Sequence, residues 1–204
     1  MKGLYLVTPN WNDTERLLAA TDAALSAGAA LVQYRHKEAD ARLRLEQATA
    51  LLALCRRHGC PFVINDHLDL CQAIDADGVH LGHTDGALAA ARALLGPDKI
   101  VGASCYGDLA LARAARDAGA SYLAFGGFYP SPVKQYTFVT PPALLDQARA
   151  EFTLPLVVIG GMTPANAAPL VARGADMVAA ITSVYGAADP RMAAHAFGSL
   201  FSAG

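Results

Sequence analysis

Three polar side chains alternate along one short stretch of the sequence: Gln33, Arg35 and Lys37. Alternate residues of an extended strand project to the same side, so the stretch predicts a row of one amide and two cations. Such a row is costly to bury unless it meets an anion. Arginine offers a planar fork for phosphate oxygens and lysine a movable charge, which predicts phosphate binding. The alternative is that Arg35 and Lys37 form ion pairs with Asp66 or Asp85.

Oxygen ligands follow in the next two apolar runs. Asn65-Asp66 ends one run, and Asp85 lies just beyond the other. Mg²⁺ keeps several waters and binds through one or two carboxylates together with substrate phosphates. We therefore predict a Mg²⁺ cofactor held by Asp66 and Asp85 beside the basic row. Asp85 has an alternative role as a charge at the start of a helix. His67, Asp69 and His80 lie close by, and one of them could contact the site, although a structural histidine is the commoner case.

A pair of glycines marks a second place for an anion. Gly160-Gly161 ends an apolar run and would let backbone amides approach a ligand, and Thr182-Ser183 ends the following run. In eight-stranded α/β barrels, the loops after strands seven and eight commonly bind phosphate. Two anion sites predict two phosphorylated substrates, or one long substrate.

The stretch 128–142 is the longest without helical periodicity, and its only charge is Lys134. Long loops that follow a strand are usually functional. We predict a lid lysine that reaches a phosphate, with a solvent-exposed lysine as the alternative.

Short β-branched or aromatic runs, which alternate with Ala/Leu-rich helical patterns, must position these groups. The expected strands are Gly3–Thr8, Ala30–Arg35, Pro61–Asn65, Gly78–Leu81, Ile100–Ser104, Tyr122–Gly126, Pro155–Gly160 and Met177–Thr182. The expected helices are Thr14–Ala27, Ala39–His58, Leu68–Ala73, Thr84–Leu95, Asp108–Ala118, Pro142–Glu151, Thr163–Arg173 and Asp189–Phe201.

A weak repeat accompanies every second expected strand. Gly28, Gly78, Gly119 and Gly174 each lie where a helix should end, just before or at the start of the next strand. We expect each of them to end that helix in the left-handed conformation. Eight strand–helix units predict one (β/α)₈ TIM barrel over residues 1–204, with a doubly wound sheet as the alternative. The barrel is favoured because no Gly-x-Gly-x-x-Gly follows the first strand and polar residues end nearly every strand.

The composition narrows the class of protein. The 204 residues are 53% hydrophobic, with a mean hydropathy of +0.27 and a formal net charge of −2. These values exclude disorder and argue against nucleic-acid or membrane-surface partners, and no apolar run is long enough for a membrane helix. Four cysteines without a Cys-x-x-Cys pair predict free thiols and a cytoplasmic protein. A homo-oligomer remains open.

In order along the chain, these motifs resemble those of the thiamine-phosphate synthase family, which is related to the thiazole tautomerases. The resemblance rests on Leu4-Tyr5-Leu6-Val7-Thr8, Gln33-x-Arg35-x-Lys37, Asn65-Asp66-His67, Asp77-Gly78-Val79-His80-Leu81-Gly82, Phe125-Gly126, Ser131-Pro132-x-Lys134, Ile159-Gly160-Gly161-Met162 and Gly174-Ala175-Asp176. It implies that a 4-amino-5-hydroxymethyl-2-methylpyrimidine diphosphate is joined to a thiazole phosphate, which gives thiamine phosphate and diphosphate.

The resemblance also assigns roles to individual residues. The pyrimidine diphosphate would be held by Gln33, Arg35, Lys37, Asn65, Ser104 and Lys134. The catalytic residues would be Arg35, Lys37, Ser104 and Lys134, and Mg²⁺ would be bound by Asp66 and Asp85. The thiazole phosphate would face Ser131, Gly161, Ile181 and Thr182.

The chain departs from the family pattern at several positions. After the fifth expected strand it reads Ser104-Cys105-Tyr106, where the tautomerase branch has a histidine, and this difference argues against tautomerase activity. His83 and Val133 replace residues that are common in the family, so the sequence leaves open whether His83 or Tyr106 contacts substrate. Two alternatives remain: an isomerase of the same fold, and a non-catalytic barrel that binds phosphorylated metabolites.

Overall fold

The eight strands form one closed parallel barrel in which each strand pairs with the next in sequence and β8 pairs with β1. The computed structural model describes residues 1–82, 87–131 and 137–201. The strands are β1 Gly3–Val7, β2 Leu31–Tyr34, β3 Phe62–Asn65, β4 Gly78–Leu81, β5 Ile100–Tyr106, β6 Tyr122–Phe125, β7 Leu156–Val158 and β8 Met177–Ala180. The predicted (β/α)₈ barrel is confirmed.

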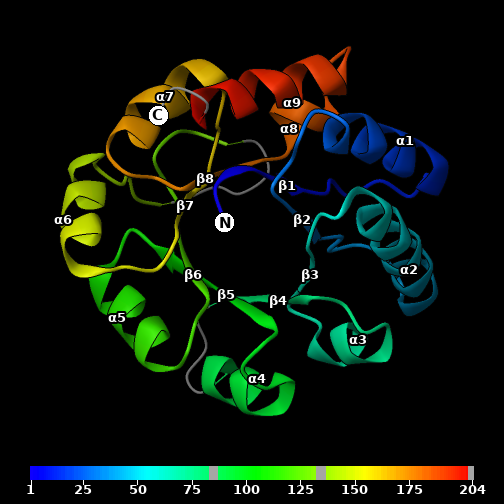
Figure 1. Cartoon of the computed structure of the whole chain (residues 1–204), viewed down its shortest axis with the longest axis horizontal. Helices are drawn as coiled ribbons and strands as arrows, with labels where there is room; N and C mark the ends of the chain where they lie inside the picture. The colour runs from blue at the N-terminus through cyan, green and yellow to red at the C-terminus, as the bar shows by residue number, and fades with distance from the viewer. Residues whose placement is uncertain (83–86, 132–136, 202–204) are drawn as a thin grey trace.

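The helices form a ring outside the strands (Figure 1). They are α1 Thr14–Leu25, α2 Ala41–His58, α3 Leu68–Ala73, α4 Ala87–Leu95, α5 Leu109–Asp117, α6 Ala143–Glu151, α7 Pro164–Ala172, α8 Thr182–Tyr185 and α9 Pro190–Gly198, followed by the 3₁₀ turn Ser199–Phe201. The expected strand Met177–Thr182 was too long, because Thr182 begins the short helix α8. The expected start of the fourth helix, Thr84, lies outside the described residues.

Two apolar layers hold the barrel together. The interior is filled by side chains such as Tyr5, Leu31, Val63, Tyr122 and Met177, all of which are buried. The opposite faces of the strands pack against the helices in a second and larger cluster. Because parallel strands here are covered on both faces, the strands read as nearly continuous apolar runs. Among the described residues, no helix is long and apolar enough to cross a bilayer.

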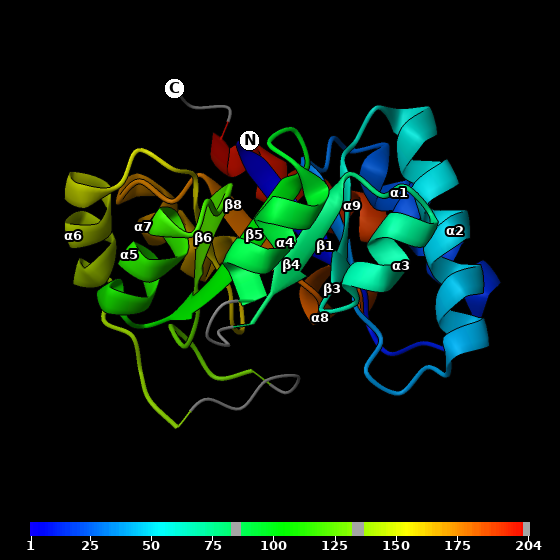
Figure 2. The ribbon, with the colours of Figure 1, turned by 90° about the horizontal axis from the view of Figure 1, so that it is seen from below.

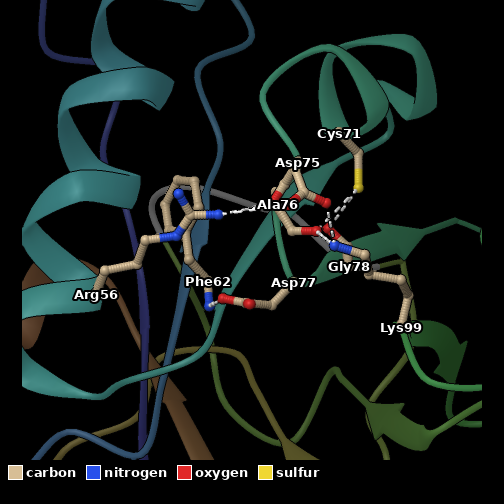
Figure 3. Close-up of polar contacts among 8 residues, drawn as sticks. All are labelled: Arg56, Phe62, Cys71, Asp75, Ala76, Asp77, Gly78 and Lys99. Carbon is tan, nitrogen blue, oxygen red and sulfur yellow. Dashed lines mark hydrogen bonds and ion pairs between the residues drawn. The ribbon is translucent and has the colours of Figure 1, made fainter.

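The two ends of the barrel differ in what they carry. Figure 2 shows the N-terminal residue at one edge, and α8 together with the chain that leaves β6 at the other. The second edge is the C-terminal end of the strands, where active sites of this fold lie. The first edge carries the structural contacts in Figure 3, where Lys99 Nζ lies 2.6 Å from Asp75 Oδ1 and 2.8 Å from the Ala76 carbonyl oxygen.

The glycines of the repeat follow the expectation at three of four positions. Gly28, Gly119 and Gly174 have φ values of +90°, +86° and +98°, which place them in the conformation that glycine adopts most readily. Gly78 begins β4, as the expected strand Gly78–Leu81 has it, but the expectation that it ends a helix in the left-handed conformation was wrong, because Asp75 has the positive φ of 54° at that position. Gly78 is needed for space, because a Cβ there would lie 2.0 Å from the backbone oxygen of Ile100.

Gly78→Ala is therefore expected to destabilise the fold by about 3 kcal/mol, the upper part of the range for an overpacked core. The measurement is the urea midpoint followed by circular dichroism. The matched control is Gly198→Ala at the end of α9, where a Cβ would meet its nearest atom at 3.9 Å. The control should be neutral or slightly stabilising, so equal losses in both variants would contradict the steric account.

The same kind of side-chain hydrogen bond connects β4 to β3, β6 to β5 and β8 to β7. The residue just before β4, β6 or β8 accepts a hydrogen bond from the backbone N–H of its odd neighbour: Asp77 from Phe62 at 2.8 Å, Ser121 from Val101 at 3.0 Å, and Asp176 from Leu156 at 2.8 Å. Figure 3 shows the first of these contacts. The sequence repeat thus marks side-chain acceptors as well as helix ends.

All four cysteines are free and buried, as the sequence predicted. Burial raises the pKa of Cys60 and of Cys105 to about 12, and that of Cys71 to about 11. A raised pKa leaves little thiolate at neutral pH, and thiolate is the reactive form. We expect no rapid reaction of the native chain with a disulfide thiol reagent at pH 8, and reaction of all four thiols in guanidinium. Fast labelling of the native chain would contradict this.

Candidate active site

One pocket opens at the C-terminal end of the barrel and contains about 950 Å³ of space, its solvent-open mouth included. Eight residues predicted as site residues line the pocket: Gln33, Arg35, Asn65, Ser104, Ser131, Gly161, Ile181 and Thr182. The fold thus brings together residues from six different strands or the loops that follow them.

Gln33 and Arg35 lie in the predicted row, at the end of β2 and just beyond it. The backbone of Arg35 is held by Thr8: the Arg35 N–H donates to Thr8 Oγ1 at 2.8 Å, and that hydroxyl donates to the Arg35 carbonyl at 3.1 Å. Thr8 is fully buried, so this double contact fixes the point from which the guanidinium extends. Arg35 therefore supplies a positioned cation to the pocket.

Lys37 does not line the pocket with the other two members of the row. Its Nζ lies 2.6 Å from Asp66 Oδ2, which also accepts from Asn65 Nδ2 at 2.7 Å. The ion-pair alternative is thus observed for Lys37. Burial alone would raise the pKa of the Asp66 carboxyl, but Lys37, Asn65 and the backbone N–H of Gly82 outweigh it, so that the net pKa is lowered. Asp66 remains a carboxylate at neutral pH.

Asp66 has the geometry of a rim ligand. Its φ of 61° turns the chain sharply after β3, and its N–H donates to the His80 carbonyl at 2.9 Å. Its side chain stays 40% exposed, which suits a cation that retains most of its water. The described residues contain no group of three or more potential metal-ligating His, Cys, Asp or Glu side chains. Asp66 thus offers one partly exposed carboxylate at the rim, while Asp85 lies outside the described residues.

The opposite side of the pocket is formed after β7 and β8. Gly160 and Gly161 have φ values of +110° and +60°. A Cβ on Gly161 would lie 2.1 Å from the backbone oxygen of Pro130, so only glycine fits where the loop after β6 crosses β7. Ile181 and Thr182 also line this side of the pocket.

The floor of the pocket carries polar groups that were not among the predicted site residues. Tyr5 and His80 line the pocket together with Ser104. His80 donates or accepts at both ring nitrogens, to Tyr122 Oη at 2.8 Å and to Ser104 Oγ at 2.9 Å. We had expected a structural histidine as the commoner case, and His80 is hydrogen-bonded as expected but also lies at the site. An available signal was the period of two, which places His80 on the inward face of β4.

Tyr106 also lines the pocket, which answers part of the question about substituted positions. It ends β5 after a register irregularity between Ser104 and Tyr106, while Cys105 points away and is fully buried. The predicted site residues Asp85 and Lys134, and the substituted positions His83 and Val133, lie outside the described residues.

Comparison with known proteins identifies the family of this chain. The model of the family described as thiamine monophosphate synthase matches residues 4–184. The thiamine-phosphate synthase of Janthinobacterium sp. (strain Marseille) is 62% identical over 99% of this chain and 98% of its own length. That of Thiobacillus denitrificans (strain ATCC 25259 / T1) is 52% identical over 98% and 95%.

A solved structure extends the likeness to the backbone. The thiamine phosphate pyrophosphorylase from Pyrococcus furiosus superimposes with a TM-score of 0.85 at 32% identity, covering 97% of this chain and 94% of that chain. The resemblance seen in the sequence motifs is confirmed over nearly the whole length. The chain belongs to the thiamine monophosphate synthase family.

Proposed function

We propose that this chain is a transferase that joins 4-amino-5-hydroxymethyl-2-methylpyrimidine diphosphate to a thiazole phosphate, with release of diphosphate. The observation that carries the proposal is one pocket with two different polar ends. Arg35 and Asn65 lie at one end, and Gly161 and Thr182 at the other. Two phosphorylated substrates can therefore meet in the middle of a single barrel mouth.

The chemistry requires no protein nucleophile. The bond between the pyrimidine methylene carbon and the diphosphate oxygen breaks, and the electron pair leaves with the diphosphate. The electron-rich aminopyrimidine carries the positive charge that develops, and the thiazole nitrogen then forms the new C–N bond. Arg35 and Lys37 would stabilise the departing charge. Each cation at about 4 Å contributes on the order of 4 kcal/mol of Coulomb energy at an effective dielectric near 20.

The remaining roles follow the same division. Gln33, Asn65 and Ser104 would hold the pyrimidine substrate, and Ser131, Gly161, Ile181 and Thr182 would hold the thiazole phosphate. We assign Lys134 to the diphosphate, and Asp66 with Asp85 to Mg²⁺. When bound, the metal would neutralise part of the diphosphate charge. Free buried thiols support a reducing compartment, and we place the reaction in the cytoplasm.

The test is diphosphate release by the full chain with both substrates and Mg²⁺. We expect one thiamine phosphate for each diphosphate, no release when either substrate is omitted, and loss of turnover with EDTA that excess Mg²⁺ restores. Metal-independent conversion of the thiazole phosphate alone would instead identify the isomerase. Binding of both substrates without turnover would identify the non-catalytic barrel.

A further inference from the structure

A continuous chain of hydrogen bonds crosses the floor of the pocket from β2 to β5. Gln33 Nε2 donates to Tyr5 Oη at 2.5 Å, Tyr5 Oη lies 2.6 Å from Tyr122 Oη, and Tyr122 Oη lies 2.8 Å from His80 Nδ1. His80 Nε2 completes the chain to Ser104 Oγ at 2.9 Å. Both end residues, Gln33 and Ser104, line the pocket.

The barrel register makes this chain possible. His80 lies beside Gly102 in the β4–β5 pair, and Gly102 lies beside Tyr122 in the β5–β6 pair. A Cβ on Gly102 would lie 2.2 Å from the Tyr122 hydroxyl oxygen. The missing side chain lets the Tyr122 ring cross β5 and stack on His80, with ring centroids 5.6 Å apart and an interplanar angle of 17°.

The hydrogens in this chain must all point the same way. Each tyrosine hydroxyl has one hydrogen, and burial raises the pKa of Tyr5 and of Tyr122 above the ordinary value, so both keep it. Because Tyr5 accepts from Gln33, its hydrogen goes to Tyr122, and the Tyr122 hydrogen goes to His80 Nδ1. His80 therefore carries its hydrogen on Nε2 and donates it to Ser104.

The direction of the chain decides what its two ends offer a ligand. One N–H of the Gln33 amide donates to Tyr5, so the amide oxygen remains for the pocket as an acceptor, beside the second N–H as a donor. Ser104 Oγ accepts from His80, so the serine hydrogen is the donor that remains. Reversing every link would exchange the two roles. A buried donor that meets a donor, or an acceptor that meets an acceptor, is costly. The direction of the hydrogen-bond chain therefore decides which arrangement of donors and acceptors a ligand must have.

We propose that the chain from Gln33 through Tyr5, Tyr122 and His80 to Ser104 selects an amino-substituted pyrimidine over an oxo-substituted one. This inference rests on the proposed function. A 4-aminopyrimidine offers an N–H donor beside a ring-nitrogen acceptor, which matches the Gln33 amide oxygen beside its second N–H, while Ser104 adds a hydroxyl donor to the same pocket. A 4-oxopyrimidine offers an oxygen acceptor beside a ring N–H donor, the reverse pattern. Tyr5, Tyr122 and His80 are thus positioning residues for specificity.

The probes are two competitive inhibitors that lack the diphosphate leaving group: the 5-hydroxymethyl-2-methylpyrimidine monophosphates with a 4-amino or a 4-oxo group. We expect the wild-type chain to bind the amino compound about 100-fold more tightly, because two mismatched contacts are avoided. Tyr122→Phe keeps the stacked ring but breaks the hydrogen-bond chain. In this variant the ratio of the Ki for the oxo compound to the Ki for the amino compound should fall at least about 10-fold. Tyr5→Phe should act in the same direction and provides a second variant.

The matched control is Tyr34→Phe. Tyr34 is another buried tyrosine whose hydroxyl bonds a glutamine side chain, Gln47 at 3.0 Å, and it does not line the pocket. Its Ki ratio should equal that of wild type. A wild-type ratio near one, or Tyr122→Phe and Tyr5→Phe variants that weaken both inhibitors equally, would overturn the inference. Wild-type turnover of both substrates is measured alongside, so failure of the proposed function is seen separately.

Discussion

Arg35→Ala is expected to lower kcat/KM for the pyrimidine diphosphate about 10³-fold, because it removes a positioned cation from the departing negative charge. Arg35 lines the pocket, and the buried Thr8 hydroxyl fixes its backbone through both the N–H and the carbonyl. Since those contacts involve backbone atoms only, the variant should keep its fold. The measurement is steady-state diphosphate release.

Two comparisons make the Arg35 prediction specific. Arg35→Lys keeps the charge but loses the planar fork, so it should recover only part of the lost rate. Arg16→Ala removes an arginine that stacks on Trp11 at 3.8 Å from the ring centroid, away from the pocket. It should leave turnover unchanged. Full activity in Arg35→Ala, or equal losses in both alanine variants, would exclude a direct role for Arg35.

Asp66→Asn is expected to lower kcat/KM about 10²- to 10³-fold, the size of effect seen when one preorganised charge or donor is removed. It should also raise the Mg²⁺ concentration for half-maximal rate at least about 10-fold. The reason is that Asp66 is the rim carboxylate, which stays ionised beside Lys37 and partly exposed to solvent. The measurement is a Mg²⁺ titration of diphosphate release at saturating substrates.

The Lys37–Asp66 ion pair offers a way to separate metal binding from simple pairing. If Asp66 only positioned Lys37, then Lys37→Gln, Asp66→Asn and the double variant would lose the same activity with an unchanged Mg²⁺ requirement. We expect instead that Lys37→Gln leaves the Mg²⁺ requirement unchanged or lower, because a competing cation has left Asp66 Oδ2. Only the variants that lack the Asp66 carboxylate should need more Mg²⁺. An unchanged Mg²⁺ requirement in Asp66→Asn would contradict the assignment of Asp66 as a Mg²⁺ ligand.

Local sequence patterns were enough to predict the order of the barrel. Alternating apolar runs and helical periods gave every strand and all helices except α8, which is only four residues long and continues an apolar run. Helix starts such as Asp108, whose side chain accepts from Ala110 N–H, lie within one residue of the predicted boundary. The boundaries that failed lay mainly at strand ends, where the predicted strands ran into the loops that build the site.

Eight of the twelve predicted site residues line the pocket, since strand ends of a closed barrel converge on one rim. The pairing of Lys37 with Asp66 was only the alternative prediction, because alternation assigns a side of the strand only as far as the strand continues, and β2 ends at Tyr34. The glycine at position 78 was likewise misassigned, since its role depends on a neighbouring backbone oxygen in β5.

The sequence by itself determined the barrel, the family and the polar residues that face its mouth, because each depends on residue types at fixed local spacings. Only the tertiary structure decided how Tyr5, His80 and Tyr122 connect Gln33 to Ser104. That chain joins residues up to 117 positions apart. It depends on the register of β4, β5 and β6 and on the space above Gly102, and register between strands is set by the closure of the whole barrel.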